Sequence, residues 1–340
     1  MKPKYKRLIK RTFLGIAFSI ALLWVAYIFW QPGLTVRDGR DNLNQNALWI
    51  GHGWFGADSW FTENNKTNQA SFRSSAGIGR LTKLCAQNGI TDVYPHLCPN
   101  QPDGSIAAWD DQQIERFLND APRLRVLPWI GGRLDKTATI ASQPWRAKFV
   151  ASMSKLLRTH PRLAGVHLNF EPWNSGDARM LVMLDEVRAV LPPGKQLSVS
   201  AYPPPEWFYP YRKGWADSYF EQVALRCDQM ALMAYDSSAQ HDKLYQWFMA
   251  RWTRKSLQLT AGNPRKTRIL MGVPTYDDIS NDAGWTYHNS KVESPENAIT
   301  GIHRGLNQLG GRPSNFQGIA IYSEWVTDER EWSSIRREWK

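Results

Sequence analysis

Residues Leu163–Pro172 read LAGVHLNFEP and have the alternating pattern of a β-strand. Successive side chains of a strand point to opposite faces, so this run has an apolar face (Val166, Leu168, Phe170) and a polar face (His167, Asn169, Glu171). A central strand of a parallel sheet is covered on both faces and is usually apolar throughout. Polar groups on it are costly unless they have partners or a function. Pro172 ends the run and leaves Glu171 at the carboxyl end of the strand. The alternative is a surface strand whose polar face lies in water.

Short apolar segments alternate with amphipathic segments along the rest of the chain. The eight strands that we expect are Ala47–Phe55, Thr91–Leu97, Arg125–Gly131, Leu163–Glu171, Gln196–Tyr202, Gln229–Tyr235, Ile269–Thr275 and Gly318–Tyr322. The expected helices are Ala76–Ala86, Asp111–Asn119, Trp145–Thr159, Asp177–Leu191, Trp215–Leu225, Leu244–Thr253, Pro295–Leu309 and Glu329–Trp339. This alternation is typical of parallel βα units. Eight units over roughly 290 residues fit one closed barrel better than a doubly wound sheet. The predicted fold class is therefore α/β, a single (β/α)₈ TIM barrel spanning residues 47–340.

The N-terminus has the composition of a membrane anchor. Residues 1–12 are basic, and Phe13–Trp30 contains no charged residue. Eighteen uncharged residues are near the lower limit for a transmembrane helix, and the preceding positive charges predict a cytoplasmic N-terminus. A cleaved signal peptide is the alternative, but it needs small residues at its cleavage site, whereas this segment ends in YIFWQP. We therefore expect an uncleaved anchor at 13–30 and a polar linker at 31–46. The barrel would then be periplasmic or extracellular, on a single-pass membrane protein.

The distribution of charge argues against a nucleic-acid-binding function. The formal net charge is +11, and six of the positive charges lie within the first eleven residues, which leaves +5 for the rest. No basic stripe of the kind found in nucleic-acid-binding proteins follows, so we expect no nucleic-acid partner. No Cys/His cluster has metal-ligand spacing, so we expect neither a metal site nor a cofactor. We expect a monomer.

Five segments, in order along the chain, together resemble one enzyme family. Gly165 and Glu171 match a fourth-strand motif, Asp-Gly-x-Asp-x-Asp-x-Glu, with Ala164, His167 and Asn169 at the three Asp positions. The other segments are WIGG at 129–132, MAYD at 233–236, GVPTY at 272–276 and GIAIYS at 318–323. The set resembles the strands of glycoside hydrolase family 18, the chitinase-like barrels. WIGG lacks the Ser of that family's third-strand motif, and Tyr322 stands where the family usually has Trp.

This resemblance implies substrate-assisted retaining hydrolysis of an N-acetylhexosamine-containing polysaccharide. In that reaction the acetamide carbonyl of the sugar attacks the anomeric carbon, and one enzyme carboxylic acid protonates the leaving oxygen. Glu171 would be this acid, and burial would raise its pKa toward useful values. Asn169 would hold the acetamide N–H, as in the related family 85 endo-N-acetylglucosaminidases, which use an Asn-x-Glu pair. Tyr235 would donate its hydroxyl to the acetamide oxygen, and Asp236 would bind sugar hydroxyls.

Further residues at or beyond the strand ends are candidates for substrate binding. Aromatic rings there offer flat apolar faces to sugars. The candidates are Tyr276, Tyr322, Glu324, Trp325, Trp54, Trp129 and Trp173, with Trp207 and Trp285 in the same position along their loops. Packing inside the domain is the competing interpretation for the tryptophans. His167 lies deeper along its strand, and we expect it to be a hydrogen-bonded core residue.

Two other functions remain open. A non-catalytic glycan-binding barrel would explain the loss of the acidic residues at Ala164 and His167, whereas the retained Glu171 and the intact MAYD motif favour an enzyme. A different retaining glycosidase would need a second carboxylate about 5 Å from Glu171, and Glu324 is the candidate. Replacement of Glu324 by Gln would separate this last alternative from substrate assistance.

Overall fold

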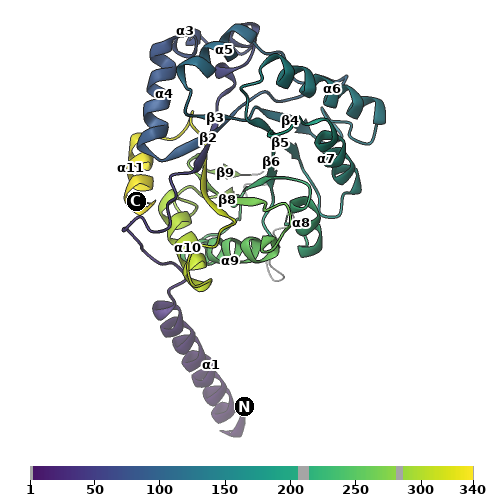
Figure 1. Cartoon of the computed structure of the whole chain (residues 1–340). Helices are drawn as coiled ribbons and strands as arrows, with labels where there is room; N and C mark the ends of the chain where they lie inside the picture. Colours follow the sequence, from purple (N-terminus) through teal and green to yellow (C-terminus); the bar gives the residue numbers. More distant parts are fainter. Residues whose placement is uncertain (1–2, 206–213, 281–285, 340) are drawn as a thin grey trace.

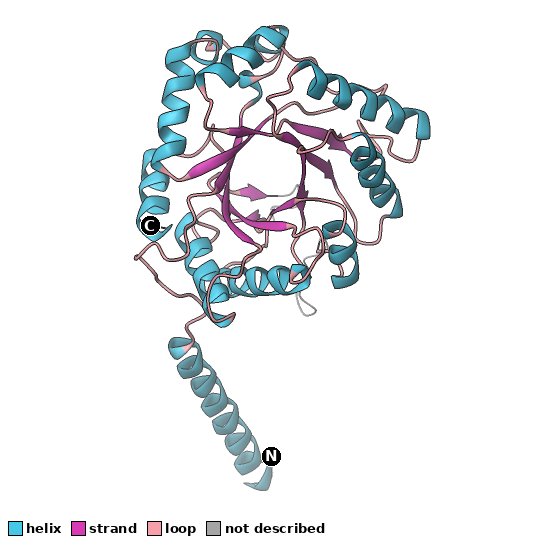
Figure 2. Ribbon diagram, in the orientation of Figure 1, coloured by secondary structure: helices cyan, strands magenta, loops and turns pink. Residues whose placement is uncertain are grey.

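The computed structural model describes residues 3–205, 214–280 and 286–339, and its centre is a ring of parallel strands (Figure 2). In sequence order the strands are β1 (Asn46–Ile50), β2 (Ile90–Pro95), β3 (Arg125–Val126), β4 (Trp129–Arg133), β5 (Gly165–Glu171), β6 (Gln196–Ala201), β7 (Gln229–Leu232), β8 (Arg268–Pro274) and β11 (Phe316–Tyr322). Their spatial order is β3-β2-β1-β11-β8-β7-β6-β5-β4. The sheet thus begins at β3 and ends at β4, which are consecutive pieces of one segment, so the ring is closed. The predicted α/β barrel is confirmed.

The third predicted strand is interrupted at residues 127–128, between β3 and β4. Pro128 has no backbone N–H to donate to a neighbouring strand. The two pieces also face different neighbours, because β3 pairs with β2 and β4 pairs with β5. The break therefore lies where the segment passes from one side of the ring closure to the other.

Helices surround the ring in the positions that the sequence predicts (Figure 1). They are α4 (Ser75–Gln87), α5 (Asp111–Asp120), α6 (Gln143–Thr159), α7 (Ala178–Val190), α8 (Asp217–Ala224), α9 (Asp242–Thr260), α10 (Pro295–Gln308) and α11 (Glu329–Trp339). Five of them begin at a Ser or Asp whose side chain accepts a hydrogen bond from a first-turn N–H: Ser74, Asp110, Ser142, Asp177 and Ser294. Such caps satisfy donors that the helix itself leaves free, and they fix where each helix starts after its strand.

Several short elements were not predicted. They are the 3₁₀ turn η1 (His52–Trp54), α2 (Ser59–Glu63), α3 (Gln69–Phe72) and an antiparallel pair, β9 (Ile279–Ser280) and β10 (Thr286–His288). The turn η1 replaces the end of the predicted strand Ala47–Phe55, because β1 already ends at Ile50. All of them follow the carboxyl end of β1 or β8. Elements of two to five residues are too short to show a periodic pattern in sequence.

The strand β5 has the two faces that its alternation predicts. Val166, Leu168 and Phe170 are buried in the apolar layer between the ring and the helices. His167 points into the ring, where Trp49 and Tyr94 form part of a separate inner cluster. The polar face of β5 therefore lies inside the barrel, not in water.

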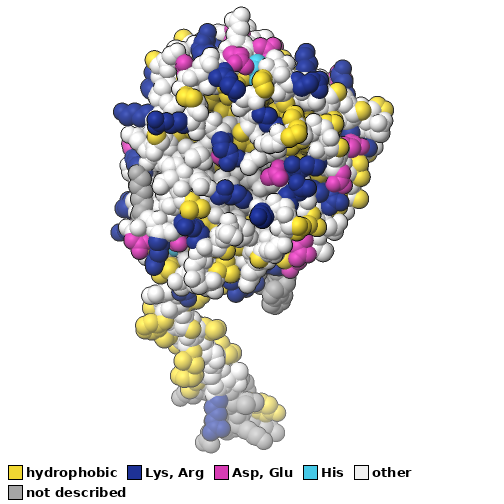
Figure 3. Space-filling view, in the orientation of Figure 1, with side chains coloured by type: hydrophobic (Ala, Val, Ile, Leu, Met, Phe, Trp, Pro, Cys, Tyr) yellow, Lys and Arg dark blue, Asp and Glu magenta, His cyan; other side chains and the backbone are white. Residues whose placement is uncertain are grey.

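Helix α1 (Pro3–Phe29) extends away from the barrel as an isolated rod (Figure 1). Its segment Arg11–Phe29 is long and apolar enough to cross a membrane, and none of it is buried against the domain. Hydrophobic side chains cover this helix in the space-filling view (Figure 3). By length and composition the segment fits either a membrane span or a signal sequence.

The segment between α1 and β1, expected to be a linker, is packed against the barrel. Pro32 and Val36 are buried, and the Leu34 N–H donates to the Thr300 carbonyl of α10 at 2.9 Å. Asp41 Oδ2 lies 2.6 Å from His303 Nδ1, also on α10. The chain that leaves α1 is thus held along the side of the domain.

Candidate active site

A cavity of about 270 Å³ opens at the carboxyl ends of the barrel strands. This volume lies near the lower end of the range for small-ligand pockets. Eight of the predicted site residues line it: Trp129, Asn169, Glu171, Tyr235, Asp236, Tyr276, Tyr322 and Trp325. These residues come from segments as far apart in the sequence as Trp129 and Trp325. Closure of the ring brings them to one mouth, as expected for a barrel of this type.

Glycine on the neighbouring strand permits the close packing around Asn169. Gly131 pairs with Asn169 in the β4–β5 register and has a φ of 145°. A Cβ at Gly131 would overlap the backbone oxygen of Asn169. Gly131 and Gly132 of the WIGG segment lie in β4, where glycine at 131 is needed for close strand contact.

Glu171 lies at the end of β5, half-buried at the cavity wall. The hydroxyl of Tyr202 donates a hydrogen bond to Glu171 Oε1 at 3.3 Å. Burial raises the pKa of Tyr202, and the nearby Glu171 carboxylate raises it further, so this phenol stays protonated as a donor. Cys98 is also close enough for the Glu171 carboxylate to add to the burial that raises the pKa of its thiol. Glu171 therefore has a neutral, largely buried surrounding on this side.

Three residues that line the cavity hold buried polar atoms without a hydrogen-bond partner in the described protein: Asn169 Oδ1, Trp129 Nε1 and Ser323 Oγ. Buried polar groups in folded proteins are nearly always paired, and each exception calls for a physical reason. Together the three offer one acceptor, one donor and one hydroxyl to the cavity. Such a set can form hydrogen bonds with a polar ligand.

Stacked phenols form the wall opposite β5. The ring of Tyr235 is stacked with that of Tyr322 at 5.5 Å between centroids and meets Tyr276 edge-on at 5.7 Å. Trp325 contacts Tyr322 edge-on at 5.8 Å and is 49% exposed. The wall is therefore aromatic and partly open, with its hydroxyl groups as polar points.

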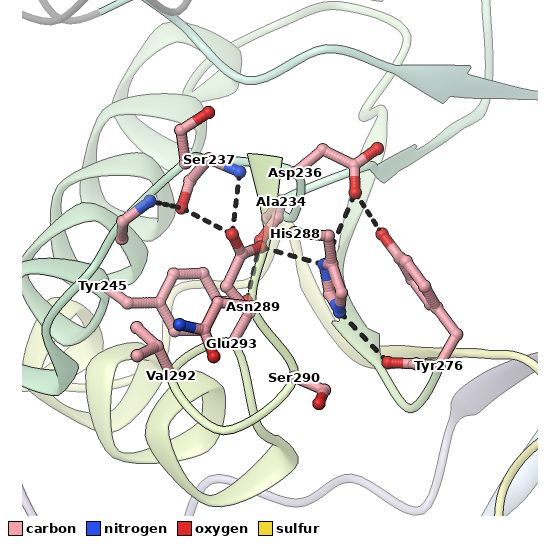
Figure 4. A network of polar contacts seen from close by, with 12 residues as sticks. Ala234, Asp236, Ser237, Tyr245, Tyr276, His288, Asn289, Ser290, Val292 and Glu293 are labelled. Atoms are coloured by element: carbon pink, nitrogen blue, oxygen red, sulfur yellow. Dashed lines mark hydrogen bonds and ion pairs between the residues drawn. The ribbon is translucent and has the colours of Figure 1, made fainter. Parts of the chain in front are cut away.

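Behind this wall, Asp236 belongs to a buried polar network (Figure 4). Asp236 has a φ of 57°, a left-handed conformation that Asp tolerates better than most residues. Its Oδ1 accepts a hydrogen bond from the Tyr276 hydroxyl and lies 3.4 Å from His288 Nδ1. The same nitrogen is 3.4 Å from Glu293 Oε2, and Glu293 Oε1 accepts hydrogen bonds from the Ser237 N–H and hydroxyl.

His288 is surrounded by acceptors and is fully buried. Its Nδ1 faces the two carboxylates, and its Nε2 lies 3.1 Å from the Tyr276 carbonyl, so both nitrogens need a proton to interact favourably. Burial lowers the pKa of His288, but the carboxylates of Asp236 and Glu293, each 3.4 Å from Nδ1, outweigh it and raise the pKa to about 9. An imidazolium between two acids thus holds Asp236 at the cavity.

His167 has the structural role that the sequence predicts. Its Nδ1 lies 2.8 Å from Ser198 Oγ, and its Nε2 lies 2.9 Å from Ser200 Oγ and 3.1 Å from Trp49 Nε1. Its ring is stacked on Tyr94 at 4.0 Å. Burial lowers the pKa of His167 to about 3, so the ring is neutral.

Three predicted binding residues do not line the cavity. Trp54 is 5% exposed and packs on Phe72, and its Nε1 donates to Glu324 Oε2 at 3.4 Å. The Glu324 carboxylate also accepts from the Gly51 N–H at 3.2 Å. Trp173 is 1% exposed and donates to the Tyr219 hydroxyl at 2.7 Å. The two tryptophans pack within the domain, and Trp207 and Trp285 lie outside the described residues.

Four residues of the site, His288, Glu293, Tyr202 and Ser323, were not predicted from the sequence. His288 and Glu293 belong to the segment between β8 and α10, which has no periodic pattern or motif. Two of the four had a usable signal, because Tyr202 ends the predicted strand Gln196–Tyr202 and Ser323 belongs to the GIAIYS segment.

Comparison with known proteins supports the fold. Neither a protein-family model nor a curated protein matches the sequence. Among solved structures, the spore cortex-lytic enzyme SleL of Bacillus megaterium QM B1551 aligns with a TM-score of 0.57 at 12% identity, over 87% of this chain and 74% of SleL. A class V chitinase from Pseudomonas fluorescens Pf-5 aligns with a TM-score of 0.54 at 14% identity, over 87% of this chain and 99% of the chitinase. A chitinase from Bacteroides thetaiotaomicron aligns with a TM-score of 0.54 at 14% identity, over 86% of this chain and 96% of the chitinase. The predicted resemblance to chitinase-like barrels is thus confirmed at the level of the fold.

Proposed function

We propose that this chain is a membrane-anchored glycoside hydrolase that cleaves an N-acetylhexosamine-containing polysaccharide outside the cytoplasm. The observation that carries the proposal is the set of unpartnered polar atoms around Glu171 in the strand-end cavity, with Asn169 Oδ1 foremost. The shared fold with a cortex-lytic enzyme and with chitinases supports a glycosidase. The proposed partner is the polysaccharide, and no cofactor is needed.

In the proposed reaction Glu171 is the general acid. It protonates the leaving glycosidic oxygen while the carbonyl oxygen of the substrate's own acetamide attacks the anomeric carbon. Water then opens the oxazolinium intermediate, with Glu171 as the base, and the anomeric configuration is retained. The Tyr202 hydroxyl, which donates to Glu171 Oε1, would hold the carboxyl group in one orientation through both steps.

Asn169 and Tyr235 would position the acetamide. The Asn169 Oδ1 is a buried acceptor on the same face of β5 as Glu171, suited to the acetamide N–H. Tyr235 lines the same cavity and would donate to the acetamide oxygen. Asp236, Tyr276 and Tyr322 would contact the sugar hydroxyls and ring, with Trp129 and Trp325 as apolar faces.

The contacts of the acidic residues near the cavity favour substrate assistance over a mechanism with a second catalytic carboxylate. The residues lining the cavity include two acids, Glu171 and Asp236, and Asp236 is engaged by Tyr276 and His288. Glu324, the candidate for a second carboxylate, accepts hydrogen bonds from Gly51 and Trp54 and is not among the lining residues.

Hydrolysis of N-acetylglucosamine oligomers by the full chain in neutral detergent tests the proposal. We expect wild type to release shorter products with retained anomeric configuration, and Glu171→Gln to lower kcat by about 10³-fold or more, because the leaving group then lacks its acid. Glu324→Gln is the matched control and is expected to keep activity within a few-fold. De-acetylated oligomers should remain uncleaved, because they lack the internal nucleophile.

A non-catalytic glycan-binding barrel is the alternative, and the replacement of two family acids by Ala164 and His167 favours it. A glycan array probed with wild type and Glu171→Gln separates the two functions. Binding by both proteins without any cleavage would mean a lectin. Loss of activity in Glu324→Gln as complete as in Glu171→Gln would instead mean double displacement.

A further inference from the structure

A second cavity lies where α1 meets the barrel and shares no lining residue with the cavity at the strand ends. It has a volume of about 380 Å³ and is lined by residues of three segments: Phe29, Trp30, Gln31 and Pro32 at the end of α1 and just beyond it; Trp247, Ala250, Arg251 and Arg254 on α9; and Arg304 and Gln308 on α10. Figure 1 shows α9 and α10 side by side at the end of the domain from which α1 leaves. This cavity takes no part in the proposed hydrolysis.

The lining combines three guanidinium groups with indole rings. Arg251, Arg254 and Arg304 are half-buried, and the residues that line the cavity include no Asp or Glu. The guanidinium of Arg251 lies over the ring of Trp247 at 4.7 Å. Arg254 Nε and Arg304 Nε are buried and have no hydrogen-bond partner within the described residues. Such a set attracts an anion, and guanidinium groups bind phosphate oxygens in a bidentate manner.

Contacts fix the end of α1 beside this cavity. Lys243 Nζ donates to the carbonyls of Tyr27 at 2.7 Å and Ile28 at 3.0 Å, which are acceptors at the C-terminus of α1. Pro32 is buried, and Leu34 is hydrogen-bonded to Thr300 of α10. The cavity therefore keeps its place directly beyond the last turn of the apolar helix.

The position of the cavity beside α1 indicates which anion it would bind. Arg11–Phe29 has the length and hydropathy of a membrane span, so residues 29–32 would lie at the level of lipid headgroups. Aromatic residues such as Trp30 and Trp247 favour this interface, and guanidinium groups placed there bind phosphate oxygens. We propose that the cavity bounded by Trp30, Arg254 and Arg304 binds the phosphate headgroup of an anionic phospholipid. This site rests on α1 as a membrane anchor and is independent of the proposed hydrolysis.

Native mass spectrometry of the delipidated full chain in neutral detergent tests the site. The probes are phosphatidylglycerol and, as a neutral lipid, phosphatidylcholine. We expect wild type to retain one phosphatidylglycerol and little phosphatidylcholine, and Arg254→Gln/Arg304→Gln to weaken this retention at least about tenfold. Arg80→Gln/Arg123→Gln removes the same charge from exposed positions on α4 and before β3 and should bind as wild type does.

Two further measurements distinguish a lipid headgroup from free inorganic phosphate and test whether α1 still inserts. Excess inorganic phosphate should not displace the lipid, because it lacks the acyl chains that lie along α1. Equal retention of both lipids, equal loss in both double variants, or displacement by inorganic phosphate alone would each overturn the proposal. Resistance of the Arg254/Arg304 variant to carbonate extraction from membranes shows that α1 still inserts, which separates loss of the headgroup site from loss of the anchor.

Discussion

At the scale of single residues, the proposed chemistry depends on an amide, Asn169, at a position where the family 18 motif has an acid. Asn169 Oδ1 is buried at the cavity without a partner in the described protein, and Gly131 leaves room for the backbone behind it. An unpaired buried acceptor costs stability, so its retention in the cavity is consistent with a ligand that donates to it. A neutral acceptor can bind an acetamide N–H, but it cannot neutralise a cationic intermediate as a carboxylate would.

Asn169→Ala tests this residue directly. We expect kcat/KM for N-acetylglucosamine oligomers to fall by about 10²–10³-fold, because the acetamide loses the contact that aligns it for attack. Asn169→Asp is the matched variant and should retain activity within about tenfold, since its carboxylate also accepts the N–H. Steady-state kinetics measures both. Unchanged kcat/KM in Asn169→Ala would remove Asn169 from the mechanism.

At the scale of elements, the segment between β8 and α10 packs its polar side chains against two residues of the cavity wall, Asp236 and Tyr276. The pair β9–β10 carries His288 to a buried position between Asp236 and Glu293, where its ring is stacked on Tyr276 at 3.9 Å. Asp278 precedes β9, and hydrogen bonds from the backbone N–H and hydroxyl of Ser290 lower the pKa of its carboxyl group, with a smaller contribution from the charge of His288. Burial raises the pKa of Glu293, so His288 provides the positive charge that this pair of acids requires.

His288 should make stability depend on pH in the alkaline range. Its folded pKa of about 9 exceeds the ordinary histidine value of 6.5, so its contribution is complete below pH 6.5 and is lost as the pH rises to about 9. The effect is on the order of 1–3 kcal/mol. Chemical unfolding of wild type between pH 6.5 and 9 should show this decline, and His288→Asn should be less stable at pH 6.5 and lose much of the slope. Parallel curves for the two proteins would contradict a charged His288.

At the scale of the whole molecule, the chain joins a closed barrel to one exposed apolar helix. The barrel mouth and the α1 end of the domain are lined by different elements, so the proposed sugar site and the proposed lipid site do not compete. We propose that α1 is an uncleaved anchor with a cytoplasmic N-terminus and that the barrel works as a monomer in the periplasm or outside the cell.

Membrane fractionation tests the anchor. Wild type should resist carbonate extraction, and intact mass spectrometry of the extracted chain should find residues 1–30 still present, because YIFWQP offers no small-residue cleavage site. A chain without residues 1–30 should appear in the soluble fraction when it is directed outside the cytoplasm by another signal. Recovery of a shortened wild-type chain from the soluble fraction would mean that α1 is a signal peptide.

The sequence alone determined the features that depend on local pattern. The alternation of Val166, Leu168 and Phe170 with polar residues identified the central strand and its two faces, and eight such strands identified the barrel. Because strand ends of a barrel converge, their positions along the chain were enough to assign eight of the predicted site residues to one mouth. The core role of His167 followed from its depth along the strand in the same way.

Only the tertiary structure decided which side chains face the cavity from irregular loops. Trp54, Trp129 and Trp173 were all predicted from residue type and an expected strand-end position. Trp129 lines the cavity, whereas Trp54 and Trp173 pack elsewhere in the domain, because the path of the chain and not periodicity sets their direction. His288 reaches Asp236, and Glu293 reaches His288, from a segment without regular pattern, and the arginines around α1 come from two different helices. Periodicity encodes the face of a regular element, but contacts between distant irregular segments depend on how the closed ring arranges them in space.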